Sequence, residues 1–383
     1  MPPTQILISA GEASGDMYAA RLATALRARA DVHLFGMGGP RMRDAGVELV
    51  ADCSEVSLVG IVEIAKKLPA LNRVWKRLMG EVQRRKPPLA ILTDFPGFHL
   101  RLARELKRQG VQNIYFVCPQ FWAWRPWRAN LVRRRFARGL CIFPFEQEWY
   151  RSRGVRADFI GHPLVGNVAA KRSRAEFAAS VGLDADKPIV ALLPGSRAGE
   201  IAHHVPPLMQ ACHLIQKSHP VQFVLALAPG MNKSQIAGYL PSDLRVHVVE
   251  DATYDALGAA DLAIVSSGTA TVEAALMNAP MIVIYRLAPV TAAIARWLVR
   301  TPMFAMVNLI AGKRVVPELV QKDFTPERLA NEAIRLLDSP EARAEMQRGL
   351  AEVREKLGPP GAIDRAADTI AEMLKASEIT RQP

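Results

Sequence analysis

The sequence has few cysteines and no long apolar run. These two features limit the classes of protein to which the chain can belong. Its four cysteines are scattered without a C-x-x-C pair, which argues against a disulfide framework or a cysteine zinc site and favours a reducing compartment. No stretch reaches the roughly 18 apolar residues expected of a membrane-spanning helix. The nearest, residues 279–299, is interrupted by Arg286 and Arg296. The N-terminal segment lacks the charged region of a signal peptide, so we expect a cytoplasmic chain that at most attaches to a membrane surface.

Common nucleotide and metal motifs are also missing. The spacings G-x-x-x-x-G-K-[ST] and G-x-G-x-x-G do not occur, which argues against ATPases and dehydrogenases. The adjacent His203 and His204 do not belong to an H-E-x-x-H motif. We therefore predict no metal site and no cofactor.

Basic residues, by contrast, are in surplus, with 49 Lys and Arg against 37 Asp and Glu. The surplus indicates an anionic partner: nucleic acid, a membrane surface or a phosphorylated substrate. It is concentrated in residues 66–86, which hold eight basic residues and one acid, and in residues 125–138, which hold six arginines and no acid. A solvated helix face explains such clusters equally well.

Short apolar runs alternate with helical patterns, which predicts an α/β fold with parallel sheets covered by helices on both faces. The segment 161–188 has no strong strand signal, and we place a domain junction there. This predicts two doubly wound, Rossmann-like domains, at residues 1–166 and 167–359, facing each other across a cleft with ligands at the carboxyl edges of their strands. From Thr325 onward only helical patterns remain. The expected strands are 6–9, 32–35, 89–92, 114–117, 139–142, 158–160, 189–193, 221–226, 246–248, 262–265 and 281–284.

A strand–turn–helix corner in the second half has the features of a phosphate site. Gly195, Ser196 and Arg197 follow an apolar run. The glycine lets backbone amides approach a phosphate, the serine adds a hydroxyl donor, and the arginine supplies a bidentate cation. The alternative is an N-capping serine with a solvated arginine.

A second corner in this half is rich in small and hydroxyl side chains. Ser267, Gly268 and Thr269 join a strand to a helix and would let a ligand lie against the backbone. Glu273, about one turn into the helix, can accept both hydroxyl hydrogens of a ribose. Pairing with the helix dipole is the alternative role for Glu273. Together the two corners fit a nucleoside diphosphate.

Carboxylates mark the corresponding corners of the first half. The stretch GEASGD places Glu12, Ser14 and Asp16 after the first strand, with no Lys or Arg. Asp94 ends another strand beside two phenylalanines, whose apolar rings would desolvate the carboxyl and raise its pKa, as suits a general base. Helix capping is the alternative role for Ser14, Asp16 and Asp94.

Three tryptophans of the first half, Trp122, Trp124 and Trp127, alternate with arginines. Aromatic and basic residues together can stack on bases, lie at a membrane interface or enter a core. No RNA-binding signature accompanies them, so we expect contact with an anionic membrane surface and no nucleic acid. The same role is expected of residues 58–71.

Taken together, these segments make the whole chain resemble the bacterial lipid-A-disaccharide synthase family. The matching stretches keep their order from end to end, and as a set they are specific although each is short. They are GEASGD (11–16), GGPRM (38–42), VGIVE (59–63), DFPGF (94–98), WAWR (122–125), PFE (144–146), GHP (161–163), LLPGSRAGEI (192–201), SSGTATVE (266–273), NLIAG (308–312) and PELVQ (317–321).

The resemblance implies an inverting glycosyltransferase of the GT-B architecture. Its donor is UDP-2,3-diacylglucosamine, its acceptor is 2,3-diacylglucosamine 1-phosphate, and its products are the β-1′,6-linked disaccharide 1-phosphate of lipid A biosynthesis and UDP. The C-terminal half would hold UDP, and the last helix, residues 360–383, would cross back to the first domain. The protein would act at the inner face of the bacterial inner membrane, and a homodimer stays an open alternative.

The resemblance also assigns site residues. Asp94 matches the acid that deprotonates the acceptor 6-hydroxyl, Arg197 and Asn308 match two further catalytic residues, and Glu273 matches the acid at the uridine ribose. The first corner is assigned to the acceptor side, through Glu12, Ser14, Gly15 and Asp16.

Two substitutions depart from the family pattern. Many relatives carry a second acid in a D-x-P-D-F segment, where this chain has Gly97, and if that acid were the base, Asp94 would be misassigned. Cys118 replaces a common serine. Two rivals use the same fold, a muropeptide-lipid N-acetylglucosaminyltransferase and a UDP-N-acetylglucosamine epimerase, and GEASGD and WAWR argue against both. A non-catalytic nucleic-acid or membrane binder is the rival of another class.

Overall fold

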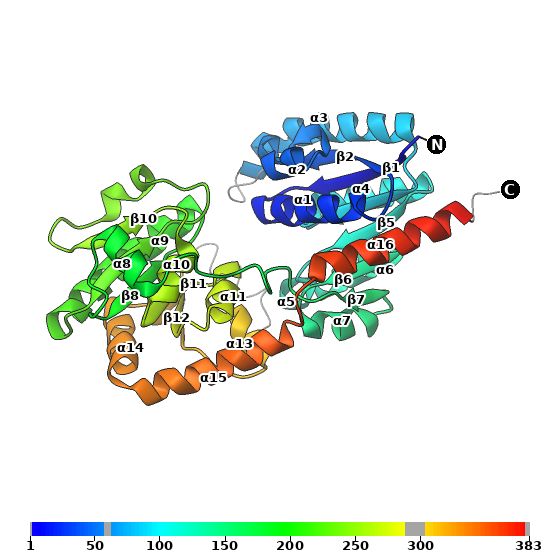
Figure 1. The fold of residues 1–383 in the computed structure, drawn as a ribbon. Coiled ribbons are helices and arrows are strands. Elements are labelled where there is room, and N and C mark those ends of the chain that lie inside the picture. Colours follow the sequence, from blue (N-terminus) through cyan, green and yellow to red (C-terminus); the bar gives the residue numbers. More distant parts are fainter. Residues whose placement is uncertain (1, 57–62, 288–302, 380–383) are drawn as a thin grey trace. The chain divides into compact units, whose positions relative to one another are not determined.

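The computed structural model describes residues 2–56, 63–287 and 303–379, and the chain divides into two compact units. Unit 1 comprises Met1–Pro163 and Gly358–Pro383, and unit 2 comprises Leu164–Leu357. Each unit contains one parallel β-sheet between layers of helices (Figure 1), so the predicted α/β fold with two doubly wound sheets is confirmed. The junctions lie at 163/164 and 357/358, whereas the sequence analysis placed them at 166/167 and 359/360.

The seven strands of unit 1 are all parallel. They are β1 (Thr4–Ala10), β2 (Val32–Gly38), β3 (Glu48–Asp52), β4 (Leu89–Thr93), β5 (Gln112–Phe116), β6 (Arg138–Cys141) and β7 (Ala157–Phe159). Their order in the sheet is β3-β2-β1-β4-β5-β6-β7, so β1 pairs with β4 although the chain first runs outward to β3. At such a reversal, the carboxyl ends of the two strands are where α/β proteins bind ligands.

Two layers of helices cover this sheet. They are α1 (Ala13–Arg27), α2 (Pro40–Asp44), α3 (Glu63–Arg85), α4 (Pro96–Arg108), α5 (Phe121–Trp124), α6 (Ala129–Arg135), α7 (Pro144–Arg151) and α16 (Ala362–Ile379). Strand residues on one face, among them Leu7, Ala90 and Tyr115, form a single buried core with α3, α4 and α6. Because successive strand residues point to opposite faces, Ile6 and Ile8 serve the other face, where α1 and α16 contact each other.

The six strands of unit 2 are parallel as well. They are β8 (Ile189–Leu193), β9 (Gln222–Ala226), β10 (Val246–Val249), β11 (Leu262–Ser266), β12 (Met281–Tyr285) and β13 (Glu318–Val320). The order β10-β9-β8-β11-β12-β13 places the reversal between β8 and β11. The sequence analysis missed β3 and β13, because both are short edge strands with charged residues and carry little apolar signal.

The helices in the described part of unit 2 begin and end at recognisable sequence signals. They are α8 (Arg174–Val181), α9 (Ala198–Ser218), α10 (Thr253–Ala259), α11 (Thr269–Leu276), α13 (Met306–Ala311), α14 (Pro326–Asp338) and α15 (Pro340–Lys356). Ser173 caps α8 by accepting a hydrogen bond from the amide of Glu176, and Gly182 ends the helix at φ 73°. The left-handed conformation at Gly182 is one that residues with a Cβ adopt only at a cost.

The C-terminal helix α16 is part of unit 1, as predicted. Its residues Ala366, Ile370 and Leu374 are buried on one side of the helix. Arg29, two residues after the end of α1, forms ion pairs with Asp364, at 2.9 Å, and with Asp368, at 2.5 Å. The apolar stripe and these ion pairs hold α16 against α1.

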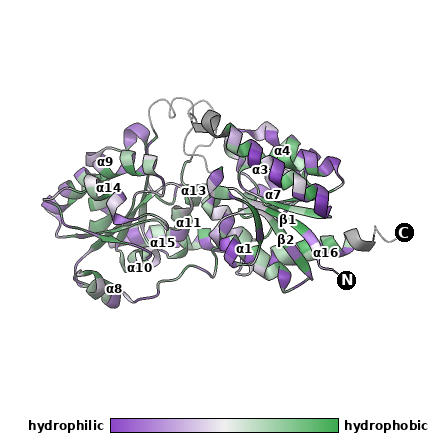
Figure 2. Ribbon diagram, turned by 90° about the horizontal axis from the view of Figure 1, so that it is seen from above, coloured by the Kyte–Doolittle hydropathy of each residue, from purple (hydrophilic) through white to green (hydrophobic). Residues whose placement is uncertain are grey.

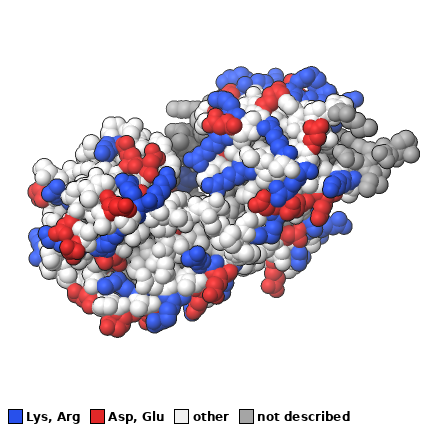
Figure 3. All heavy atoms as spheres, in the orientation of Figure 1, with Lys and Arg blue, Asp and Glu red and all other residues white. Residues whose placement is uncertain are grey.

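Polar and apolar residues are distributed as expected of such layers. In Figure 2 the strands are predominantly apolar, while the helices carry polar residues on their outer sides. Among the described helices, none has the length and apolar character needed to cross a membrane. On the face drawn in Figure 3, basic side chains gather along the edge of unit 1 where α3 lies in Figure 1.

The docking of α16 generates a stability prediction. Ile370 is fully buried, so replacing it with alanine removes apolar contacts and leaves a cavity. We expect Ile370→Ala to lower the free energy of unfolding by about 2–5 kcal/mol, measured by urea denaturation. Glu372→Ala, at an exposed position of the same helix, is the matched control and should change it by less than about 0.5 kcal/mol. Equal effects of both substitutions would contradict the packing.

Candidate active site

The carboxylate of Asp94 lies at the strand reversal of unit 1. Asp94 directly follows β4, and Gly11 directly follows β1, the neighbouring strand. Asp94 Oδ1 accepts a hydrogen bond from the amide of Gly11 at 2.8 Å, and Oδ2 accepts one from the amide of Glu12 at 3.2 Å. The two motifs GEASGD and DFPGF are therefore parts of one site.

The backbone at Asp94 is held in an unusual conformation. Asp94 has φ 54° and Phe95 has φ 41°, both in the left-handed region that is costly for residues other than glycine. The carbonyl of Asp94 accepts hydrogen bonds from His99 Nδ1–H at 2.9 Å and from the Tyr115 hydroxyl at 3.0 Å. His99 Nε2 in turn accepts one from Ser9 Oγ at 2.8 Å. The N-cap of α4 is Phe95, so Asp94 is not the capping residue of that helix.

Two glycines leave room for this arrangement. A Cβ added to Gly15 would lie 1.7 Å from Asp94 Oδ2, and one added to Gly11 would lie 2.6 Å from Phe95 Cβ. Real Cβ atoms do not approach other heavy atoms this closely. The glycines of GEASGD therefore allow Asp94 and Phe95 to pack against the corner, a role that sequence reasoning did not find.

The environment of Asp94 favours its protonated form. Burial raises the pKa of the Asp94 carboxyl well above its usual value, and the negative charges of Glu12 and Asp16 raise it further. The amides of Gly11 and Glu12 act in the opposite direction because they donate to the carboxylate. A carboxylate with a raised pKa is a stronger base, which suits it to take a proton from a hydroxyl group.

The other residues of the first corner divide into exposed and buried ones. Glu12 and Ser14 are exposed, whereas Gly15 and Asp16 are buried. The Asp16 carboxylate accepts three hydrogen bonds from α2 and the residue before it: from the amides of Gly39 at 2.7 Å and Met42 at 3.1 Å through Oδ1, and from that of Arg41 at 3.1 Å through Oδ2. Asp16 thus caps α2 rather than α1, and it joins GEASGD to GGPRM.

In unit 2 the backbone amides of the corner after β8 are hydrogen-bonded to a nearby glutamate, Glu200. Glu200 Oε2 accepts hydrogen bonds from the amides of Ser196 at 2.9 Å and Arg197 at 3.3 Å. Its Oε1 lies 3.5 Å from Arg197 Nη1, and the Arg197 side chain is 67% exposed. Gly195 has φ 130°, and a Cβ there would lie 2.5 Å from Glu200 Oε2. An anion that binds these two amides must therefore displace the Glu200 carboxylate.

A buried histidine, His204, holds the backbone of this corner in place through hydrogen bonds. His204 is fully buried, and burial lowers its pKa, so the ring is neutral. Its Nδ1–H donates to the carbonyl of Pro194 at 2.6 Å, and its Nε2 accepts from the amide of Arg286 at 2.9 Å. Arg286 follows β12 directly, so His204 connects the turn after β8 to the end of another strand of the same sheet.

The second corner of unit 2 follows β11, next to β8, so the two corners share one edge of the sheet. Gly268 and Thr269 are exposed, and Ser267 Oγ donates to the carbonyl of Phe304 at 3.1 Å. Glu273 accepts a hydrogen bond from the Tyr254 hydroxyl at 2.9 Å, while burial raises the pKa of the Glu273 carboxyl. Tyr254 was not among the predicted residues, because nothing in the sequence pairs α10 with α11.

Asn308 is fully buried and uses its whole amide within unit 2. Its Nδ2 donates to the carbonyl of Val316 at 3.0 Å and to Glu318 Oε1 at 2.8 Å. Its Oδ1 accepts from the amides of Val315, at 2.8 Å, and Val316, at 3.0 Å. Glu318 also accepts from the amide of Ala305, at the start of α13. The motifs NLIAG and PELVQ are therefore joined by a side chain that holds the backbone in place.

The three tryptophans of the WAWR region differ in environment. Trp122 is half-buried and donates from Nε1 to Glu146 Oε1 at 3.0 Å. Glu146 is fully buried, and burial raises its pKa to about 7. The Trp124 ring lies 4.3 Å from the guanidinium carbon of Arg125, and Trp127 is 60% exposed. The link between WAWR and PFE through Trp122 and Glu146 was not predicted.

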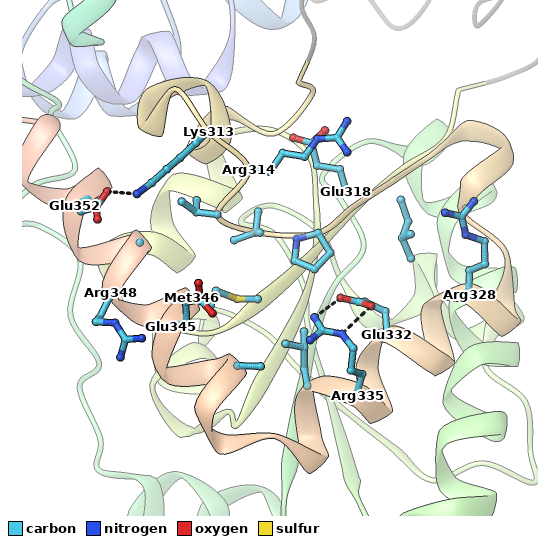
Figure 4. A pocket seen from close by; sticks show the side chains of 17 residues that line it. Lys313, Arg314, Glu318, Arg328, Glu332, Arg335, Glu345, Met346, Arg348 and Glu352 are labelled. Carbon is cyan, nitrogen blue, oxygen red and sulfur yellow. Dashed lines mark hydrogen bonds and ion pairs between the residues drawn. The ribbon is translucent and has the colours of Figure 1, made fainter.

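A groove of about 680 Å³ lies elsewhere, beside the edge strand β13 of unit 2 (Figure 4). It is lined by α14, α15 and the segment 313–319, and ion pairs join Lys313 to Glu352 and Arg335 to Glu332. No predicted site residue lines it.

In the part of the chain that the structure describes, no group of three His, Cys, Asp or Glu side chains could hold a metal ion. Residues 58–62 of the predicted membrane segment 58–71 lie outside the described residues; Leu68 is 56% exposed.

Comparison with known proteins identifies close relatives over the whole length. The family model described as "Lipid-A-disaccharide synthetase" matches residues 6–370. A lipid-A-disaccharide synthase of Solibacter usitatus is 45% identical over 375 residues, which cover 97% of this chain and 98% of the relative. One of Myxococcus xanthus is 43% identical over 380 residues, covering 98% and 99%.

Solved structures share the fold at much lower identity. The Staphylococcus aureus MnaA–UDP co-structure matches with a TM-score of 0.67 and 14% identity, covering 99% of each chain. Acinetobacter baumannii MurG matches with a TM-score of 0.57 and 17% identity, covering 97% of this chain and 100% of the other. These likenesses show the GT-B fold.

The buried His99 predicts a stability that depends on pH. Burial lowers the pKa of His99 to about 4, whereas in the unfolded chain it is about 6.5. Between these values the unfolded chain binds the proton and the folded chain does not, so the free energy of unfolding decreases as the pH falls from about 6.5 to about 4. The difference between the two pKa values corresponds to about 3 kcal/mol.

Urea denaturation at pH 7 and pH 4.5 tests this. Carboxyl groups also titrate in this range, so the change between the two pH values is compared in the native chain and in His99→Gln, which cannot gain the charge. The native chain should lose more stability, by up to about 3 kcal/mol. An equal loss in both would show that His99 is not held neutral.

Proposed function

This chain belongs to the lipid-A-disaccharide synthase family, and from that premise we propose how its residues divide the reaction. The protein is a glycosyltransferase of lipid A biosynthesis that condenses UDP-2,3-diacylglucosamine with 2,3-diacylglucosamine 1-phosphate. Unit 1 binds the acceptor and unit 2 binds the donor. Each substrate takes the carboxyl edge of a sheet, where the strand order reverses.

Asp94 is the general base. The observation that carries this assignment is its carboxylate at the β1/β4 reversal, held by two amides, with a pKa raised by burial. The proton of the acceptor 6-hydroxyl passes to Asp94 while the oxygen forms a bond to C1 of the donor sugar. The bond from C1 to the diphosphate oxygen breaks, and its electron pair leaves with UDP. This single displacement inverts the configuration at C1.

The acceptor sugar is bound by the first corner. Glu12 and Ser14 are exposed there and can accept hydrogen bonds from sugar hydroxyl and amide groups. Gly15 and Asp16 act behind them: Gly15 leaves space for Asp94, and Asp16 connects the corner to α2. The negative charge of this corner discourages the diphosphate of UDP from binding on the acceptor side.

The donor is bound by the two corners of unit 2. The Arg197 side chain and the backbone amides of Ser196 and Arg197 bind the diphosphate in place of the Glu200 carboxylate. These groups also stabilise the negative charge of the leaving UDP. Ser267, Gly268 and Thr269 lie along the nucleotide, and Glu273 accepts the ribose hydroxyl hydrogens. The S. aureus MnaA co-structure, which has the same fold, contains UDP, and this supports a UDP ligand for the fold. Asn308, whose amide is fully used, is a positioning residue.

The acylated substrates place the reaction at a membrane. We infer that the protein acts on the cytoplasmic side of the bacterial inner membrane as a peripheral protein. The exposed side chains of Trp127 and Leu68 supply apolar contacts on unit 1, and the surplus of Lys and Arg attracts anionic lipids. Trp124 lies three residues before Trp127, and Trp122 anchors this segment through its hydrogen bond to Glu146.

The role of Asp94 is tested by Asp94→Asn, assayed with both diacylated sugars. Without a group that can accept the proton, kcat should fall roughly 10²–10⁴-fold. In the native enzyme, activity should decrease as the pH falls through the raised pKa of Asp94, so the acidic limb of the profile should lie above the pH of about 4 usual for aspartate. Asp94→Asn should lack this limb.

Asp44→Asn makes the same chemical change at an exposed position of unit 1 and should leave kcat unchanged. UDP binding by calorimetry shows whether unit 2 of each variant is folded. Undiminished product formation by the Asp94→Asn enzyme would show that Asp94 is not the general base. Absence of product with the native enzyme would contradict the glycosyltransferase activity itself.

The donor site is tested by comparing UDP with 2′-deoxy-UDP in calorimetry. Glu273→Gln should weaken UDP binding roughly 10-fold, since hydrogen bonds to a charged acceptor are lost, and should change 2′-deoxy-UDP binding much less. Tyr254→Phe should have a smaller effect in the same direction, because Tyr254 only orients the carboxylate. Glu345→Gln, exposed on α15, is the control. Equal weakening of both nucleotides would place Glu273 away from the ribose.

A further inference from the structure

Two arginines of unit 1 converge on one tryptophan ring. The guanidinium carbon of Arg125 lies 4.3 Å from the centre of the Trp124 ring, and that of Arg128 lies 5.9 Å from the same centre. Arg128 also lies 5.8 Å from the centre of the fully buried Phe121 ring. Among the residues that the structure describes, no Asp or Glu forms an ion pair with either guanidinium, although each lies in a half-buried position.

This pair of cations neighbours the site of Asp94. The segment that carries them follows β5, which pairs with β4, and Asp94 follows β4. The Tyr115 hydroxyl donates to the Asp94 carbonyl at 3.0 Å, and the Arg128 guanidinium interacts electrostatically with the same phenol. Tyr115 therefore interacts with both the proposed base and Arg128.

The arrangement is unfavourable without a ligand. A cation that is partly removed from water loses hydration, and two cations beside one ring repel each other. For Arg128 both effects are present: burial lowers its pKa, and the charge of Arg125 lowers it further. Stacking on Trp124 offsets part of this cost but leaves the guanidinium hydrogen-bond donors available. An anion would neutralise both charges and accept those hydrogen bonds.

The chemistry of the acceptor supplies such an anion. In a glucosamine 1-phosphate, the carbon that bears the phosphate and the carbon that bears the 6-hydroxymethyl group both flank the ring oxygen. A base for the 6-hydroxyl and a cation for the phosphate must therefore lie about one sugar ring apart. The carboxylates of Asp94 and Glu12 repel a phosphate, so it needs a separate, basic site nearby.

We propose that Arg125 and Arg128 bind the 1-phosphate of the acceptor and so determine which end of the sugar faces Asp94. The planar guanidinium forks match phosphate oxygens in a bidentate manner. The inference rests on the proposed role of unit 1 as the acceptor domain. It assigns the two arginines to substrate orientation, whereas the exposed Trp127 between them serves the membrane contact.

Steady-state kinetics with two acceptors test the proposal. The acceptors are 2,3-diacylglucosamine 1-phosphate and 2,3-diacylglucosamine without the phosphate, both in the same detergent micelles. The native enzyme should prefer the phosphorylated one. Arg128→Gln and Arg125→Gln should each lower kcat/KM for the phosphorylated acceptor roughly 10–100-fold, mainly through KM, and leave that for the other acceptor and the KM of the donor nearly unchanged. Arg128→Lys should restore part of the loss, because the charge returns without the fork.

Arg134→Gln is the matched control, since it removes the same charge at an exposed position of α6. Equal losses with both acceptors would overturn the proposal and assign the arginines to the support of Asp94 through Tyr115. Unchanged kinetics, or a native enzyme indifferent to the phosphate, would also overturn it.

Sedimentation with phosphatidylglycerol vesicles separates the acceptor phosphate from the phosphates of the membrane. The two glutamine variants should bind vesicles like Arg134→Gln. Loss of vesicle binding with an unchanged acceptor preference would show that Arg125 and Arg128 bind lipid head groups instead. If Asp94→Asn stayed active while Arg128→Gln lost its preference for the phosphorylated acceptor, the assignment of Asp94 as general base would be wrong. The proposed phosphate site would still be supported by this result.

Discussion

Two backbone amides, those of Gly11 and Glu12, hold the carboxylate of Asp94 where β1 and β4 run side by side. Much of the surrounding sequence serves this contact. Gly15 leaves the space that a Cβ would fill, and His99 and Tyr115 hold the carbonyl of Asp94 so that its left-handed backbone persists. Removing a donor from this set would release a strained turn rather than only one hydrogen bond, because a strained conformation persists only where its neighbours enforce it.

Both units support a ligand-binding corner with a buried, neutral histidine. His99 connects β1 to the turn after β4, and His204 connects the turn after β8 to the end of β12. In each case one ring nitrogen donates to a carbonyl and the other accepts a hydrogen bond. A neutral imidazole can do both, whereas an imidazolium can only donate. Burial, which lowers the pKa of both rings, therefore preserves the geometry of the two corners.

Charge is distributed over unit 1 in a way that suits a substrate with two different ends. Asp94, Glu12 and Asp16 form an acidic corner after β1 and β4, while Arg125 and Arg128 form a basic one after β5. Both corners interact with Tyr115, and among the described residues no ion pair joins them. In water-poor surroundings opposite charges attract strongly, so their separation has to be maintained by the backbone. The backbone amides of Gly11 and Glu12 restrain the Asp94 carboxylate, and stacking on the Trp124 ring restrains the two guanidinium groups.

The sequence by itself determined the α/β class, the family, most strands and the corners that carry Asp94, Arg197 and Glu273, because apolar periodicity and turn residues are local signals. It did not reveal that Asp16 caps α2 or that Asn308 of α13 donates a hydrogen bond to Glu318 of β13. Nor did it pair Trp122 with Glu146 or Tyr254 with Glu273. These contacts join residues that lie 10 to 26 positions apart on different elements. Only the tertiary structure decides them, because the order of strands and the packing of helices set which ends meet, and periodicity along the chain does not encode that order.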